Sequence, residues 1–164
     1  MRNPVIGKAG SIPVFVAGLL AANAAGAANF TVASGTTDTS AKTLGSGSGQ
    51  TGSVAANGTL SISGSTVAVT ITGNSATLSN LGLITQTGTG RAIRDNTGVT
   101  GLVINNGSAA NSTATIQTAD NDVIQMAQPT ASVTLNNYGQ MISLNASKGG
   151  AQAVDFSNIT SGSN

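Results

Sequence analysis

A short motif that occurs twice, and a third time in altered form, constrains the fold of this chain more than any other feature. The clear copies, Leu78–Ile84 and Leu135–Met141, both read Leu-x-Asn-x-Gly-x followed by Ile or Met. The altered copy, Ile104–Gly107, reaches its glycine one residue early. Repetition at intervals of tens of residues is typical of solenoids, which stack one unit on the next. The chain is therefore predicted to stack a repeated unit and to be a scaffold.

A second marker recurs at a similar interval. Short apolar segments centred on Ile93, Ile124 and Val154 each follow one copy of the motif. Upstream, residues 67–71 alternate apolar and polar side chains, which is typical of a strand with one buried face. No segment after the N-terminus has the spacing of an amphipathic helix. The predicted unit is thus a strand, a glycine corner, a variable stretch and a second strand.

These patterns predict an all-β, right-handed parallel β-helix over residues 58–164, with about three to five coils. Leu and Ile of the motif are expected to fill the interior. The motif Asn is expected at a corner, with left-handed backbone angles and hydrogen bonds to its own backbone and to the Asn of the next coil. The motif Gly is expected to permit the bend. A β-sandwich of short hairpins is the alternative fold.

The first 57 residues divide into two segments. Residues 1–28 have the features of a cleaved signal peptide: a basic start with Arg2 and Lys8, an apolar stretch at 12–20 and small residues around 25–27. Cleavage is expected after Ala27 or Ala28. Residues 29–57 are rich in Gly, Ser and Thr, which predicts a flexible low-complexity segment with weak strands at 31–32 and 42–44.

Composition excludes several kinds of chemistry. The chain has no Cys, His, Trp or Glu, and its charged residues are six Lys/Arg and five Asp. Thiol and imidazole catalysis and zinc or haem sites are therefore not expected. Removal of Arg2 and Lys8 with the signal peptide leaves a charge of about −1, so no nucleic-acid partner is expected. We assign no catalytic, cofactor-binding or metal-binding residue and no cofactor.

The few acidic residues offer two hypotheses that must be weighed. Asp120 and Asp122 lie two residues apart, so on a strand they would share one face, where a Ca²⁺ corner or a pair of sugar-cleaving carboxylates is conceivable. The simpler interpretation is a solvated outer face. Similarly, Arg91 and Arg94 with Asp95 are expected to form an exposed charge cluster.

Together, the N-terminal segment, the Gly/Ser/Thr/Asn-rich start and the Leu-x-Asn-x-Gly-x-Ile coils resemble the N-terminal passenger region of bacterial autotransporters (type V secretion). The resemblance implies a Gram-negative cell, Sec-dependent export to the periplasm and display at the outer membrane or outside the cell. It implies as partners the Sec machinery, further C-terminal passenger coils with a β-barrel, and a host-surface or cell–cell adhesion target.

The resemblance also departs from the family, because no segment here matches the eight or more strands of a membrane β-barrel. A truncated passenger is therefore expected, periplasmic if the barrel is truly absent. The expected function is a non-enzymatic, stalk-like or adhesin-like surface scaffold. The alternatives are a secreted β-helix enzyme acting on polysaccharide and an unfolded remnant.

Overall fold

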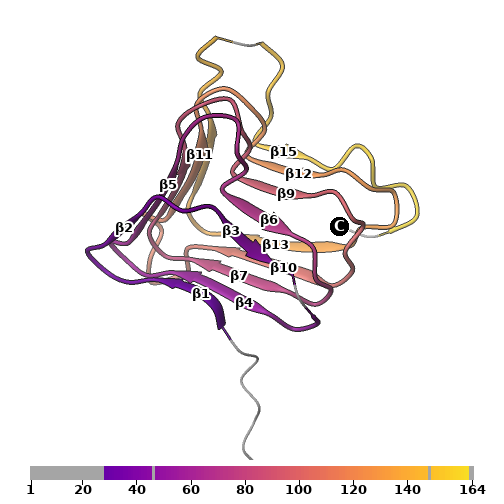
Figure 1. Cartoon of the computed structure of the whole chain (residues 1–164), viewed down its shortest axis with the longest axis horizontal. Helices are drawn as coiled ribbons and strands as arrows, with labels where there is room; N and C mark the ends of the chain where they lie inside the picture. Colours follow the sequence, from indigo (N-terminus) through magenta and orange to yellow (C-terminus); the bar gives the residue numbers. More distant parts are fainter. Residues whose placement is uncertain (1–27, 46, 148, 163–164) are drawn as a thin grey trace, which may run out of the picture.

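The computed structural model describes residues 28–45, 47–147 and 149–162, and the predicted signal peptide, apart from Ala28, lies outside them. Three parallel sheets enclose one narrow core, and the chain passes from sheet to sheet in each coil (Figure 1). Five coils of three strands result, with no helix in the part of the chain that is described. The predicted parallel β-helix is thus confirmed as a parallel β-solenoid.

Each sheet contains one strand from every coil. Sheet A consists, in spatial order, of β1 (Ala28–Val32), β4 (Thr51–Val54), β7 (Thr77–Asn80), β10 (Leu102–Asn106) and β13 (Val133–Asn137). Sheet B consists of β14 (Gln140–Ser143), β11 (Thr115–Thr118), β8 (Leu83–Gln86), β5 (Thr59–Ile62) and β2 (Thr37–Asp38). Sheet C consists of β15 (Val154–Asp155), β12 (Ile124–Met126), β9 (Ile93–Asp95), β6 (Val69–Ile71) and β3 (Lys42–Leu44).

Parallel pairing decides between the two predicted folds. Every pairing between these strands is parallel. A sandwich of hairpins requires antiparallel neighbours, so that alternative is wrong. The coil also contains three strands where the sequence indicated two. The motif itself crosses a corner, because β7 ends at Asn80 and β8 begins at Leu83.

The solenoid begins earlier than the sequence indicated. Residues 29–57, expected to be a flexible segment, contain β1 to β4 and so form the first coil and the start of the second. The expected weak strands at 31–32 and 42–44 lie within β1 and β3. The expectation failed because the small polar residues here occupy outward rows, while Val32, Leu44 and Val54 are buried at inward positions.

The core is built from side chains that stack in register from coil to coil. One inward row in sheet A places Phe30, Gly52, Leu78, Ile104 and Leu135 on successive coils. Gly52 leaves room for the ring of Phe30, since a Cβ at residue 52 would lie 2.4 Å from Cε1 of Phe30 and the ring would have to shift. Full burial of each Leu or Ile contributes about 1.5–3 kcal/mol, so a thin core of repeated aliphatic rungs suffices without large aromatic residues.

The predicted asparagine ladder is present at the corner between sheets A and B. Asn80 Nδ2 donates to Asn106 Oδ1 at 2.8 Å, and Asn106 Nδ2 donates to Asn137 Oδ1 at 2.8 Å. Asn80 Oδ1 also accepts from the backbone N–H of Gly82 at 3.2 Å. The expected left-handed backbone is wrong, because the described non-glycine residues with positive φ are others, such as Asn57. The ladder asparagines end strands instead.

The motif glycine has a different role from the one predicted. Gly82 has no positive φ, so conformational freedom is not what the position requires. A Cβ on Gly82 would lie 2.3 Å from the carbonyl oxygen of Gly58 in the preceding coil. Likewise, a Cβ on Gly139 would lie 2.1 Å from the carbonyl oxygen of Ala114. Glycine therefore permits the corners of adjacent coils to approach closely.

The altered copy of the motif contains an insertion at this corner. Thr115 pairs with Leu83 and Gln140, so Ala114, rather than Gly107, occupies the register position of Gly82 and Gly139. Residues 108–113 form an extra loop that is closed by a bridge between Ser108 and Asn111. This loop explains why the interval between ladder asparagines grows from 26 to 31 residues only after Asn106.

Candidate functional site

Acidic side chains gather near the corner between sheets B and C, but they do not lie on a solvated face as expected. Asp120 and Asp122 lie between β11 and β12 and are only 5% and 8% exposed. Asp120 accepts hydrogen bonds from the backbone N–H (2.8 Å) and the hydroxyl of Ser147. Asp122 accepts from the backbone N–H of Gln152 at 3.0 Å. Both carboxylates therefore secure the long loop that precedes β15.

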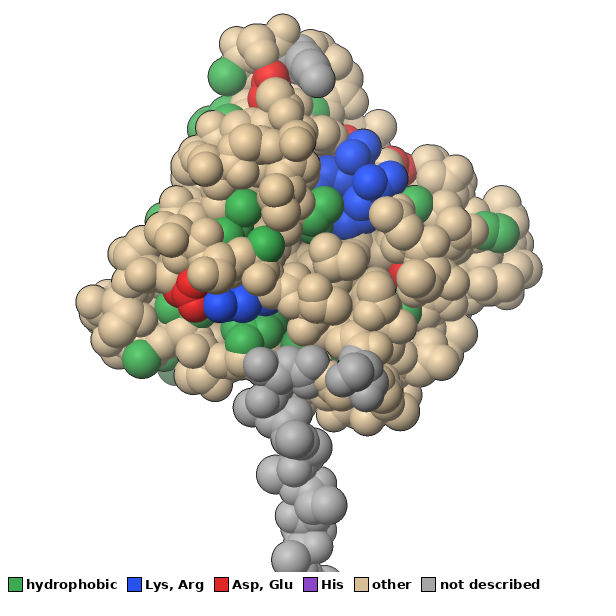
Figure 2. All heavy atoms as spheres, viewed as in Figure 1, with side chains coloured by type: hydrophobic (Ala, Val, Ile, Leu, Met, Phe, Trp, Pro, Cys, Tyr) green, Lys and Arg blue, Asp and Glu red, His purple; other side chains and the backbone are tan. Residues whose placement is uncertain are grey.

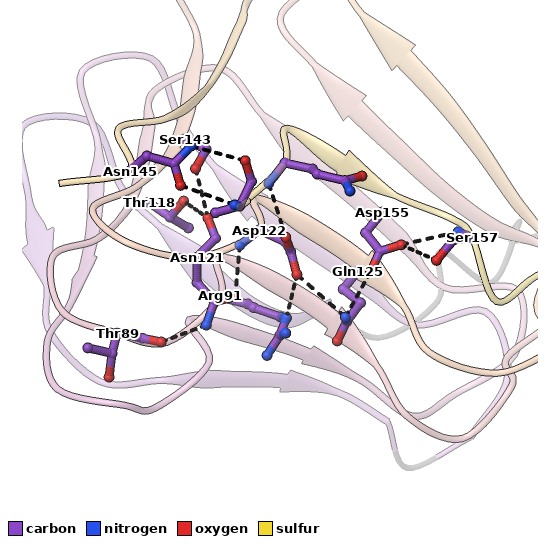
Figure 3. Close-up of polar contacts among 12 residues, drawn as sticks. Thr89, Arg91, Thr118, Asn121, Asp122, Gln125, Ser143, Asn145, Asp155 and Ser157 are labelled. Carbon is purple, nitrogen blue, oxygen red and sulfur yellow. Dashed lines mark hydrogen bonds and ion pairs between the residues drawn. The ribbon is translucent and has the colours of Figure 1, made fainter. Parts of the chain in front are cut away.

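Asp122 is also the centre of a polar network that joins coils (Figure 3). Its Oδ2 lies 3.1 Å from Nε of Arg91 and 3.4 Å from Nε2 of Gln125. Gln125 Nε2 donates in turn to Oδ2 of Asp155 at 2.9 Å. Since Asp122 and Arg91 are mostly buried, this ion pair is stronger than an exposed one but must also offset its desolvation.

The pKa values of Asp155, in this network, and of Arg94, beside it, are both lowered. Hydrogen bonds from Gln125 and Ser157 hold the pKa of Asp155 below its usual value. Burial, and then the neighbouring charge of Arg91, lowers the pKa of Arg94, while Asp122 opposes that shift. Arg94 Nε is buried without a hydrogen-bond partner. The cluster is thus a structural charge network in which the two arginines repel each other.

The expectation that Arg91, Arg94 and Asp95 form an exposed charge cluster is wrong, because both arginines are partly buried and Asp95 does not join them. Asp95 is fully buried at the end of β9, away from the arginine network. Its two carboxylate oxygens accept backbone N–H bonds at 2.7–3.1 Å from Thr97, Gly98 and Val99. Asp95 therefore closes the turn into coil 4, an effect that its sequence neighbours gave no reason to expect.

The carboxylates and the groove on sheet B lie on different parts of the surface. The hollow beside Asp120, Asp122 and Arg91 has a volume of about 270 Å³. A groove of about 350 Å³ crosses the outer face of sheet B, where Thr59, Leu83, Thr115 and Gln140 stack in register. The side chains that line this groove are uncharged. A sugar-cleaving site needs two carboxylates within the groove. Here the carboxylates of Asp120 and Asp122 lie outside the groove on sheet B.

A metal centre finds little support among the described residues. They contain no group of three or more Asp, Glu, His or Cys side chains placed to hold an ion. Asp120 and Asp122 direct their oxygens to different backbone and side-chain donors rather than to one point. Most of the visible surface is uncharged, and acidic and basic side chains are sparse on it (Figure 2).

The three parallel sheets place the chain in the class of parallel β-solenoids. Comparison with known proteins adds no relative, since no family model, curated protein or solved structure matches the chain. Within the described ranges, no helix has the length and apolar character that a bilayer crossing requires.

Proposed function

We propose that this protein is a non-enzymatic structural segment, a stalk-like or adhesin-like scaffold displayed by a Gram-negative cell. One observation supports this proposal most: the buried carboxylates and amides that could have served a reaction are hydrogen-bonded within the fold, where they hold coils and loops together. Asn80 and Asn106 join coils, Asp95 closes a turn, and Asp120 secures a loop. A stack of such coils extends in one direction and carries surface loops at its corners.

The finer parts of this proposal concern winding and export. We propose that the solenoid is right-handed, since connections between parallel strands of one sheet are right-handed in about 98% of cases. We also propose that the chain is an autotransporter-type passenger, exported by the Sec machinery and anchored through a β-barrel. The N-terminal pattern of residues 1–28 and the parallel coils support this part together.

Export is tested by expressing the full chain in a Gram-negative host and sequencing the N-terminus of the protein in each cell fraction. We expect the folded protein outside the cytoplasm with Ala28 or Asn29 as its first residue. A cytoplasmic protein that retains Met1 would refute export. It would leave the solenoid itself intact.

The alternative is a secreted enzyme that cleaves polysaccharide with Asp120 and Asp122. The double variant Asp120→Asn/Asp122→Asn keeps the size of both side chains, removes their charge and replaces one acceptor oxygen of each with an NH₂ donor, so circular dichroism must confirm that it folds. The scaffold proposal predicts no polysaccharide cleavage by the parent protein, measured as release of reducing ends. Cleavage that the parent performs and the double variant lacks would favour the enzyme.

A further inference from the structure

Two exposed apolar side chains lie together at the corner between sheets A and B. Among the described residues, the large hydrophobic side chains that are exposed are Leu81, Tyr138 and Leu144, at 37%, 57% and 58%. Leu81 and Tyr138 both border one hollow of about 540 Å³, which we call the corner pocket. That volume lies within the roughly 300–1,000 Å³ of small-ligand sites. Exposed apolar groups that share a hollow point to a ligand.

A glycine lies between the two exposed apolar residues of the pocket, at the start of the inserted loop in coil 4. Asn80, Asn106 and Asn137 are in register, so Gly107 occupies the position between Leu81 and Tyr138 and contributes no side chain. Gly107 has φ +76°, and a Cβ there would lie 2.6 Å from the carbonyl oxygen of Asn111. Glycine is therefore required at the floor of the pocket.

The inserted loop also supplies one wall. Ser108 and Ala109 line the pocket, and the loop is closed by two backbone hydrogen bonds between Ser108 and Asn111 at 2.8 and 2.9 Å. Asn111 Nδ2 donates to the carbonyl oxygen of Leu81 at 3.0 Å, which fastens the loop to coil 3. A wall held in this way is preorganised for binding.

Polar groups line the other side of the pocket. Ser79, Asn105 and Asn136 stack in register on the outer face of sheet A. Asn136 Nδ2 donates to Asn105 Oδ1 at 2.9 Å. Each primary amide carries two donors and an acceptor, so Asn105 keeps its NH₂ group and Asn136 its carbonyl oxygen for a ligand. No charged side chain lines the pocket.

We propose that the corner pocket binds a hexose unit of a neutral polysaccharide. A pyranose ring presents an apolar C–H face that can lie on the exposed ring of Tyr138, and hydroxyl groups that can both donate to and accept from Asn105 and Asn136. The lack of charge at the pocket favours a neutral sugar over a uronate or sulfated one. As an attachment site, the pocket deepens the proposed scaffold function and rests on it.

The fluorescence of Tyr138 can report on binding at the corner pocket. Tyr138 is the single Tyr and there is no Trp, so tyrosine emission from the full chain comes from this pocket. The probes are neutral gluco-, manno- and galacto-oligosaccharides, with a galacturonate oligosaccharide for comparison. We expect at least one neutral probe to change the emission of Tyr138 and to protect it from acrylamide quenching.

Variants then assign the contacts by isothermal titration calorimetry, with circular dichroism to confirm folding. Tyr138→Ala is expected to raise the dissociation constant about tenfold, and Tyr138→Phe to raise it less. Leu144→Ala is the matched control, since Leu144 is as exposed as Tyr138 but lies outside the pocket. It should leave binding unchanged.

Three results would overturn the inference: no response to any neutral probe at millimolar concentration, binding of the galacturonate probe alone, or binding that Tyr138→Ala leaves unchanged. None of them bears on the export measurement. A protein that is exported and binds no neutral sugar would therefore refute the pocket and leave the scaffold proposal standing.

Discussion

At the scale of single residues, buried polar side chains do much of the work of joining the coils. In coil 3 each corner contains one fully buried polar side chain, namely Asn80, Gln86 and Asp95. Gln86 Nε2 donates to the carbonyl oxygens of Gly64 and Thr66 at 2.9 Å each, so it fastens coil 3 to coil 2. These groups are costly to bury unless they are hydrogen-bonded, so each one favours a single register.

Asn106 is the best residue at which to test the ladder. It accepts from Asn80, and its Nδ2 donates to Asn137 and to the carbonyl oxygen of Gln140 at 3.0 Å. Asn106→Ala is expected to lower the free energy of unfolding by about 3 kcal/mol, since it takes an acceptor from the buried amide of Asn80 and removes the hydrogen bonds to Asn137 and Gln140. Urea denaturation followed by circular dichroism measures the loss. The exposed Asn136→Ala should cost about 0.5 kcal/mol, and equal losses in both variants would contradict the ladder's role.

Asp155 makes stability depend on pH on the acid side. Its pKa is lowered from the usual 3.8 by hydrogen bonds from Gln125 and Ser157. The carboxylate therefore stabilises the fold at pH above that unfolded-state value, and the contribution is lost as the pH falls through the lower folded-state pKa. Asp155→Asn is expected to flatten this acid decline in the urea midpoint between roughly pH 2 and 6. A decline as steep as in the parent would contradict the assignment.

At the scale of elements, corners rather than strands distinguish one coil from another. In sheet A, paired residues of adjacent coils lie 22, 26 or 31 positions apart in the sequence. The strands stay in register because the extra residues are confined to corners. At the corner between sheets A and B, Gly58 and Gly82 meet without side chains. Length can vary at a corner only where the insertion points outward, as residues 108–113 do.

Gly82→Ala tests this close approach. The added methyl group would meet the carbonyl oxygens of Gly58 and Ala55 at 2.3 and 2.5 Å, so the two coils must separate locally. We expect a loss of about 1–3 kcal/mol in the free energy of unfolding. Gly149→Ala is the control, because nothing lies within 4 Å of its added Cβ and its φ is not positive. A neutral Gly82→Ala variant, or an equally destabilised control, would refute the argument.

The elements that could be predicted from the sequence are those whose residues recur at similar intervals along the chain. The asparagine corner and the sheet C strands at Ile93, Ile124 and Val154 were predictable because both recur with the coil. The first coil was not, since its strands are short and made largely of small polar residues. The burial of Asp122 was also not predictable, because its partner Gln152 lies in a loop 30 residues away.

At the scale of the whole molecule, the last coil leaves one edge of every sheet unpaired within the described chain. β13, β14 and β15 each have a strand neighbour on one side only. Leu135, Met141, Phe156 and Ile159 are only partly buried there. Open edges with apolar side chains favour pairing with another chain.

The isolated chain is therefore expected to associate end to end as its concentration rises, measured by sedimentation velocity. Leu135→Lys places a charge at this edge and should reduce association. Leu144→Lys is the matched control, because Leu144 lies outside the strands. A parent protein that stays monomeric at high concentration would contradict the expectation.

The central claim is that the coils stack in parallel register along one axis, and paired spin labels test it most directly. Thr31, Asn105 and Asn136 occupy one outward row of sheet A, on coils 1, 4 and 5. Since the chain has no Cys, cysteines introduced at these positions are the only sites that a spin label modifies.

At about 4.8 Å per coil, backbone separations of ~14 Å for the pair 31/105 and ~19 Å for 31/136 are expected. Electron paramagnetic resonance should thus show two narrow distributions about 5 Å apart. Broad distributions near the roughly 45–60 Å that a flexible chain of these lengths would give would contradict the solenoid.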